Sequence, residues 1–224
     1  MANMKSLAKD TAIYGMSSII GRFLNYLLVP LYTAQISAAS GGYGVITNMY
    51  AYTALLLVIL TYGMETTFFR FVNKEGENSQ KVYTTVLSMV GFTSLLFVAL
   101  VVVFLQPLSS LMGYADHPAY VCTMFVTVAI DAFQCIPFAY LRYKKRPLKF
   151  AAFKLLFIVL NILLNVIYYV VLNGHDVGYA FYINLVCTAS ITFCFYKELK
   201  EGFCTKYASW SETKQLIGRM LRYS

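Results

Sequence analysis

Long runs of apolar residues, separated by short polar connections, dominate the chain. Each run is about 20 or more residues long, which is the length that a helix needs to cross roughly 30 Å of hydrocarbon. The pattern predicts an all-α integral membrane protein built as a bundle of six transmembrane helices. The expected spans are residues 11–36, 46–69, 82–105, 119–141, 150–172 and 177–196.

The basic residues follow the connections in strict alternation. All but one of the 18 Lys and Arg residues fall on one side of the six-span pattern. The connections on the other side, residues 37–44, 106–119 and 173–176, contain no Lys or Arg. Basic residues flank membrane spans on the cytoplasmic side, so we expect both termini to be cytoplasmic.

Composition narrows the class of protein further. Only 12% of the residues are charged and 59% are hydrophobic, whereas soluble domains carry roughly 25% charged residues. The net charge of +8 is explained by topology, so we expect no nucleic-acid partner. The 5 cysteines show no CxxC spacing, which argues against a metal site or a disulfide framework. HExxH, P-loop and GxSxG motifs are absent from the sequence, so we expect no enzyme, no catalytic residue and no cofactor.

Polar residues line one helical face of each span. In span 1 this face carries Gly15, Ser18, Arg22 and Asn25; in span 5 it carries Lys154, Asn161, Asn165 and Tyr168. Uncharged polar residues usually join membrane helices. An ionised side chain at the bilayer centre costs roughly 2.5–3.5 kcal/mol, so Arg22 and Asp131 indicate a wet cavity or a buried ion pair. Glu65 and Lys154 lie near span ends, where long side chains reach the interface.

The tail differs in pattern from the spans. We expect residues 1–200 to form the six-helix lobe and residues 201–224 to form a cytoplasmic amphipathic linker helix. Ser209 and Glu212 have capping-box spacing. The apolar face would carry Leu216, Ile217, Met220 and Leu221. Because the chain stops as it re-enters a pattern like its own start, we expect it to be half of a longer protein, with the linker leading to a second lobe.

Two segments carry a family resemblance. Residues 21–33, GRFLNYLLVPLYT, resemble the first helix of bacterial polysaccharide flippases of the Wzx type. Residues 62–71, YGMETTFFRF, resemble the end of their second helix. These flippases, which include the O-antigen flippases, belong to the MATE-like superfamily of multidrug, oligosaccharidyl-lipid and polysaccharide exporters. Six spans with both ends inside, followed by an amphipathic helix, also resemble the N-terminal lobe of such a transporter.

The resemblance implies a transporter of twelve or fourteen helices in two lobes. Such a protein flips an undecaprenyl-diphosphate-linked oligosaccharide, a polysaccharide or lipopolysaccharide precursor, across the bacterial inner membrane by alternating access. The implied partners are the lipid-linked oligosaccharide, the membrane, and the glycan polymerase and glycosyltransferase machinery. A single lobe supplies one wall of the central cavity.

Residue chemistry and the resemblance meet at Arg22. A guanidinium pairs bidentately with phosphate, so Arg22, together with Lys154, is a candidate for binding the diphosphate. Asp131 and Glu65 are candidates for pairing with Arg22 or for binding a coupling proton or sodium ion. The candidates for hydrogen bonds to sugar hydroxyls are Asn25, Asn161, Asn165 and Tyr168. Replacing Arg22 with Ala is expected to abolish glycan export and to leave membrane insertion normal.

Three alternatives stay open. A multidrug exporter of the same superfamily is the nearest, although the deep cation Arg22 favours an anionic substrate. A flippase for a lipid-linked peptidoglycan precursor is the second. The third is a non-transporting membrane scaffold, an accessory subunit or a truncated remnant.

Overall fold

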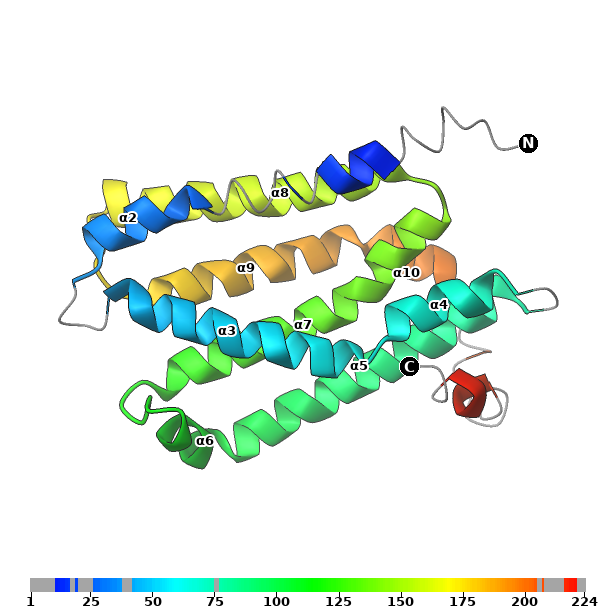
Figure 1. Ribbon diagram of the computed structural model, residues 1–224, viewed down its shortest axis with the longest axis horizontal. Coiled ribbons are helices and arrows are strands. Elements are labelled where there is room, and N and C mark those ends of the chain that lie inside the picture. Colours follow the sequence, from blue (N-terminus) through cyan, green and yellow to red (C-terminus); the bar gives the residue numbers. More distant parts are fainter. Residues whose placement is uncertain are drawn as a thin grey trace.

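The computed structural model describes residues 11–16, 19, 26–37, 42–74, 77–204, 207 and 216–220. Within these residues the regular structure is entirely helical (Figure 1). The elements are α2 (Leu28–Gln35), α3 (Gly42–Thr61), α4 (Met64–Val72), α5 (Ser79–Val103), α6 (Leu105–Leu111), α7 (Pro118–Tyr143), α8 (Pro147–Val166), the π-helix η2 (Ile167–Val171), α9 (Gly178–Cys194) and α10 (Tyr196–Gly202). Residues 11–16 and 216–220 are also helical.

Four helical segments of the described chain are long and apolar enough to cross a membrane. They are Gly42–Val72, Ser79–Val103, Pro118–Tyr143 and Pro147–Val171. Helices α9 and α10 meet at a bend of 45° and make a fifth if they are counted as one span. The predicted all-α fold is therefore confirmed for the described residues, and four or five of its helical segments are suited to a membrane. The first predicted span, residues 11–36, lies partly outside the described residues, so the count of six stays a prediction.

Helix α7 is the centre of the bundle. It packs against α3, α4, α5, α8 and α9, and it runs diagonally between them in Figure 1. In its most apolar window 67% of the residues are buried, against 22–28% in the other three spans. Small residues such as Ala129, Ala132 and Ala139 are buried on it and permit close approach of its neighbours. A polar side chain on α7 therefore faces protein or an internal cavity on most sides.

The predicted span 46–69 is divided between two helices, α3 and α4, although Gly42–Val72 still counts as one segment that could cross a membrane. The chain breaks between α3 and α4 at Tyr62 and Gly63, whose φ angles are 29° and 68°. Glycine adopts this left-handed backbone without the steric cost that a Cβ imposes. The break turns α4 against α5 and α7, where Met64 and Phe68 are fully buried. It also places Glu65 in the first turn of α4.

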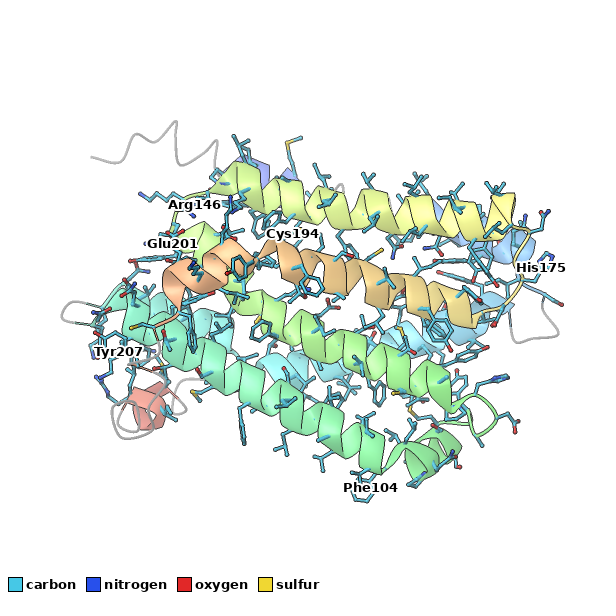
Figure 2. All side chains as sticks on the ribbon, turned by 180° about the vertical axis from the view of Figure 1, so that it is seen from behind. Phe104, Arg146, His175, Cys194, Glu201 and Tyr207 are labelled. Carbon is cyan, nitrogen blue, oxygen red and sulfur yellow. The ribbon has the colours of Figure 1, made fainter. Side chains whose placement is uncertain are left out.

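The two ends of the bundle differ in charge, as predicted. We call one the basic end; it carries Arg70, Lys74, Lys81, Arg142, Lys144, Lys145, Arg146, Lys149, Lys197 and Lys200. The other, the opposite end, carries Asp116, His117, His175 and Asp176. Figure 2 shows Arg146 and Glu201 at one end of the bundle and His175 at the other.

Ion pairs tie α10 to the turn between α7 and α8 at the basic end. Arg146 donates two hydrogen bonds to the carboxylate of Glu201, at 2.9 and 3.1 Å. This hydrogen bonding raises the pKa of the Arg146 guanidinium. The side chain of Glu198 is fully buried and pairs with Lys149. Together these contacts form a latch across the end of the bundle.

The described part of the predicted linker helix packs on the bundle. Leu216 and Met220 are buried in a cluster with Phe68 and other residues of α4, α5 and α7. Arg219 pairs with Glu77 at 2.8 Å. The apolar face predicted from the sequence is therefore covered by protein at these two positions. Ser209 and Glu212, the predicted capping box, lie outside the described residues.

Candidate functional site

Two adjoining, partly open pockets lie along α7, and we call them the two compartments of the central cavity. The first, the charged compartment, has a volume of about 580 Å³, and its lining includes Glu65, Arg142 and Lys154. The second, the tyrosine compartment, has a volume of about 520 Å³. Asp131 and Phe157 line both. The two compartments therefore meet at a carboxylate near the middle of α7.

An ion pair between α4 and α7 dominates the charged compartment. The carboxylate of Glu65 accepts a hydrogen bond from Arg142 Nη2, and the two side chains are 40% and 32% exposed. The guanidinium of Arg142 also lies against the rings of Phe69 and Phe150, at 5.3 and 5.7 Å from their centroids. Its Nε is buried and has no hydrogen-bond partner among the described residues. The guanidinium is therefore held by Glu65 and by two aromatic rings, with one buried N–H left unpaired among the described residues.

Lys154 and Asp131 complete the charges of this compartment. The ammonium of Lys154 lies 4.1 Å from the centroid of the Phe138 ring, which is a favourable cation–π geometry. It forms no salt bridge with a described residue. Asp131 accepts a hydrogen bond of 3.4 Å from the hydroxyl of Thr188 on α9. Among the described residues, two cations and two carboxylates therefore line this compartment, and Glu65 and Arg142 form the one salt bridge between them.

The tyrosine compartment lies between α2, α3, α8 and α9. Its tyrosines come from α3 and from the segment that contains α2: Tyr26, Tyr32, Tyr43 and Tyr50. Phe157 of α8 adds a further aromatic ring. Thr47, Asn161 and Asn184 add hydrogen-bonding groups. Aromatic faces together with hydroxyl and amide groups are the usual lining of a site for a polar organic ligand.

A buried hydrogen-bond network fixes one wall of this compartment. The hydroxyl of Tyr32 donates to Asn165 Oδ1 at 2.9 Å. Asn165 Nδ2 donates in turn to the carbonyl oxygen of Asn161 at 2.8 Å and lies 3.2 Å from Asn161 Oδ1. Tyr43 stacks on Tyr32 with 6.3 Å between the ring centroids. The wall is thus ordered by the protein itself, before any ligand binds.

Several polar residues of the predicted stripes join helices instead of facing the cavity alone. Gln134 Nε2 donates to the carbonyl oxygen of Thr188 and to the hydroxyl of Thr192, both at 2.8 Å. Thr127 bonds within α7, to the carbonyl oxygen of Thr123. These contacts hold α7 to α9 and satisfy helix-borne hydroxyls, which is the structural role that such residues usually have in membranes.

The predicted site residues divide into four groups, of which Tyr168 alone forms the last. Asp131, Glu65, Lys154 and Asn161 come together along the cavity. Asn165 is fully buried behind the wall, where Asn161 and Tyr32 use its hydrogen-bonding groups. Arg22 and Asn25 lie outside the described residues.

Tyr168 lines neither compartment. Its ring stacks on Tyr179 near the opposite end, with 3.9 Å between centroids and 10° between planes. The sequence placed Tyr168 on the face of Asn161 and Asn165 by α-helical spacing. It belongs to η2, however, where the chain winds as a π-helix with more residues per turn. Its neighbour Tyr169 is the ring that packs against Tyr32, with 5.5 Å between the centroids.

Arg142 is the cavity residue that sequence reasoning missed. Its charge was fully explained as a topology signal at the end of a span. Its spacing held the missing information, because Asp131, Cys135, Phe138 and Arg142 follow each other at intervals of four, three and four residues. Residues so spaced share one helical face, and all four line the charged compartment.

Neither a search for metal-binding groups nor comparison with known proteins assigns a role to this site. In the part of the chain that the structure describes, no group of three or more His, Cys, Asp or Glu residues is placed to hold a metal ion. No family model matches the sequence, and no curated protein or solved structure matches it. The fold and the cavity define an all-α membrane protein with an internal polar site. The resemblance to polysaccharide flippases rests on the two segments described above.

Proposed function

We propose that this chain is a transporter lobe that flips an undecaprenyl-diphosphate-linked oligosaccharide across the bacterial inner membrane by alternating access. The observation that carries the proposal is the division of the central cavity into a charged compartment and a tyrosine compartment. The head group of a lipid-linked oligosaccharide is divided in the same way, into an anionic diphosphate and a chain of sugars. The sequence resemblance supports the same substrate class.

The charged compartment suits the diphosphate. The side chain of Arg142 is 32% exposed, and Lys154 forms no salt bridge with a described residue. Both cations have donors that match phosphate oxygens. A diphosphate that enters this compartment competes with Glu65 for Arg142. The released Glu65 carboxylate is then available to take up a proton, which gives a route to ion coupling.

The tyrosine compartment suits the sugars. Pyranose rings present C–H groups on their faces and hydroxyls at their rims. Tyr43 and Tyr50 supply aromatic surface, and Asn161 and Asn184 supply amide groups that donate and accept hydrogen bonds. Because the tyrosine wall is already ordered, sugar binding loses less conformational entropy there than in a flexible pocket.

Orientation fits this proposal. By the positive-inside rule the basic end faces the cytoplasm, and the Glu65–Arg142 pair lies toward that end. The diphosphate would then meet the charged compartment in the leaflet where lipid-linked precursors are assembled, with the sugars reaching past Asp131 into the tyrosine compartment.

Export complementation tests the proposal. The full reading frame is expressed in a flippase-deficient strain, and surface glycan is quantified together with the amount of protein in the membrane. We expect Arg142→Gln and Lys154→Gln each to lower export at least tenfold. Lys200→Gln is the matched control, because it removes the same charge at the basic end outside the cavity. Wild-type export by both cavity variants would contradict the proposal.

A multidrug exporter is the second candidate, and one observation favours it. Asp131 lies where the tyrosine compartment begins, and a carboxylate among aromatic rings suits an organic cation. Resistance to cationic dyes in a strain that expresses the chain separates the two functions. Drug export predicts resistance that Asp131→Asn removes, together with failure to restore surface glycan. If neither resistance nor glycan export appears, the flippase for a lipid-linked peptidoglycan precursor and the non-transporting scaffold are the remaining interpretations.

A further inference from the structure

We propose that a pocket at the opposite end of the bundle binds a neutral saccharide. The pocket has a volume of about 490 Å³ and lies between the α6–α7 turn, the loop before α9, and α9 itself. It shares no lining residue with either compartment of the central cavity. The proposal therefore concerns a separate site, and it can be tested whether or not the central cavity transports.

The lining combines the two kinds of group that recognise a pyranose ring. The aromatic groups are Tyr114, His117, Tyr120 and Tyr182. The hydrogen-bonding groups include the carboxylates of Asp116 and Asp176. Flat rings pack against the C–H face of a sugar, and carboxylates accept hydrogen bonds from neighbouring hydroxyls. A pocket of this composition and size accommodates a small number of sugar units.

Charge selects the class of saccharide. The described lining has two carboxylates, two histidines and no Lys or Arg. No Lys or Arg side chain of the described lining offsets the two carboxylates. Uronic acids and sugar phosphates are repelled from such a site, whereas neutral sugars are not. The pocket is thus the electrostatic opposite of a site for a diphosphate.

Part of the pocket is held rigidly by hydrogen bonds. The hydroxyl of Tyr120 donates to Asp176 Oδ1 at 3.0 Å, and the same oxygen accepts the backbone N–H of Gly178 at 2.8 Å. On the other side Asn48 Nδ2 donates to the hydroxyl of Tyr114 at 2.9 Å. These rings are fixed from within the protein, unlike interfacial tyrosines whose hydroxyls face lipid head groups.

Another part of the pocket is free to contact a ligand. The ring of His117 is exposed and stacks on Tyr120, with 4.8 Å between centroids and 10° between planes. Its outer face is therefore a flat, supported platform. Asp116 is exposed beside it and makes no hydrogen bond or ion pair with a described residue. His175 marks the edge, where its Nδ1 lies 2.7 Å from the carbonyl oxygen of Gln35.

Binding of defined sugars to the purified full chain in lipid nanodiscs tests this site. The probes are maltotriose, mannotriose and the trimer of N-acetylglucosamine, with glucuronic acid as the charged comparison. Saturation-transfer NMR reports which sugar protons touch protein, and a titration gives the dissociation constant. We expect at least one neutral trisaccharide to bind through its C–H face, and glucuronic acid to bind at least tenfold more weakly.

Variants assign the binding to the pocket. His117→Ala should weaken the neutral sugar at least tenfold, and His117→Phe should restore most of that loss because it keeps a flat ring. Asp116→Ala should weaken it about threefold to tenfold. Asp131→Asn, in the central cavity, should leave it unchanged. Thermal unfolding of each variant shows that the fold is kept, which is expected because His117 and Asp116 are exposed.

Three results would overturn the proposal. The first is that none of the neutral trisaccharides binds the wild-type chain. The second is that His117→Ala binds as tightly as wild type. The third is that Asp131→Asn, but not His117→Ala, removes binding, which would place the sugar in the central cavity.

Discussion

The two ends of this bundle are held together by different chemistry. At the basic end, Glu198 and Glu201 of α10 bind Lys149 and Arg146 across the turn between α7 and α8. All the salt bridges between described residues lie toward this end. At the opposite end, helices are joined by hydrogen bonds in which at most one partner is charged, such as that from the Tyr120 hydroxyl to the Asp176 carboxylate. Stacked rings, such as Tyr168 on Tyr179, add to these contacts.

Topology explains the difference. The positive-inside signal places many Lys and Arg residues at one end, and there they need carboxylates to offset their mutual repulsion. The opposite end has no such charges to compensate, so tyrosine and asparagine are sufficient to join its helices. One end is therefore sensitive to loss of a charge and to salt, and the other to loss of shape or of a single hydrogen bond.

The largest effect is expected from Glu198→Ala at the basic end. The Glu198 side chain is fully buried, and its loss leaves the ammonium of Lys149, which is 33% exposed, without its carboxylate. Removal of one partner of a buried pair costs about 3–5 kcal/mol, and the partial exposure of Lys149 reduces this to about 2 kcal/mol. Titration with SDS in mixed micelles gives the free energy of unfolding of wild type and variant, and their difference is the loss of stability. A loss below about 0.5 kcal/mol would show that the pair between Glu198 and Lys149 does not stabilise this end of the bundle.

Two glycines sharpen the comparison because each packs against a tyrosine, one at each end. A Cβ on Gly202 would lie 2.5 Å from the Tyr83 ring, and a Cβ on Gly178 would lie 2.5 Å from the Tyr120 ring. Overpacking of this kind costs about 1–3 kcal/mol. We expect Gly202→Ala and Gly178→Ala each to lower the midpoint of thermal unfolding.

Only the variant at the opposite end should also weaken the neutral sugar, because Gly178→Ala displaces Tyr120 under the His117 platform. Gly44→Ala is the control for both, since nothing lies within 4 Å of its added Cβ. Equal stability of all three variants would mean that the tyrosines move aside without cost.

The long apolar helices could be predicted from the sequence, because spans follow from the length of apolar runs. The topology inferred from the Lys and Arg positions stays a prediction. The break at Gly63 could not be predicted, since an apolar run reads the same whether its helix is straight or broken. The helix is broken because Tyr62 and Gly63 adopt a left-handed backbone. The packing of α4 against α5 and α7 stabilises this break.

Site residues could be predicted only where the sequence of a single helix marks them as unusual. Asp131 and Lys154 stand out because an ionisable group in an apolar run is costly. The tyrosine compartment was missed because Tyr32 and Tyr43 come from different helices, and only tertiary packing brings their rings together. Arg142 was missed for another reason: a cation at a span end already has an explanation.

A smaller effect is expected from Asn165→Ala, between α2 and α8. The variant removes the acceptor of the Tyr32 hydroxyl and the contact to Asn161. Hydrogen bonds between membrane helices average about 0.6 kcal/mol, with a maximum near 1.7, so we expect a loss of about 1 kcal/mol. Tyr32→Phe is the partner variant, and the double variant should lose no more than Asn165→Ala alone. Additive losses in this cycle would show that the two residues do not interact.

The smallest effect, and the one that separates the two ends most directly, is expected from Arg146→Ala. Arg146 and Glu201 are each 40% exposed, and exposed ion pairs contribute about 0.2–1 kcal/mol. Raising the salt concentration from 0.1 M to 1 M shortens the Debye length from about 10 Å to about 3 Å. The stability difference between wild type and Arg146→Ala should therefore shrink in 1 M salt. The difference for Asn165→Ala should stay the same, because no ion pair is lost; if both differences shrink equally, the assignment of charge to one end and neutral bonding to the other is wrong.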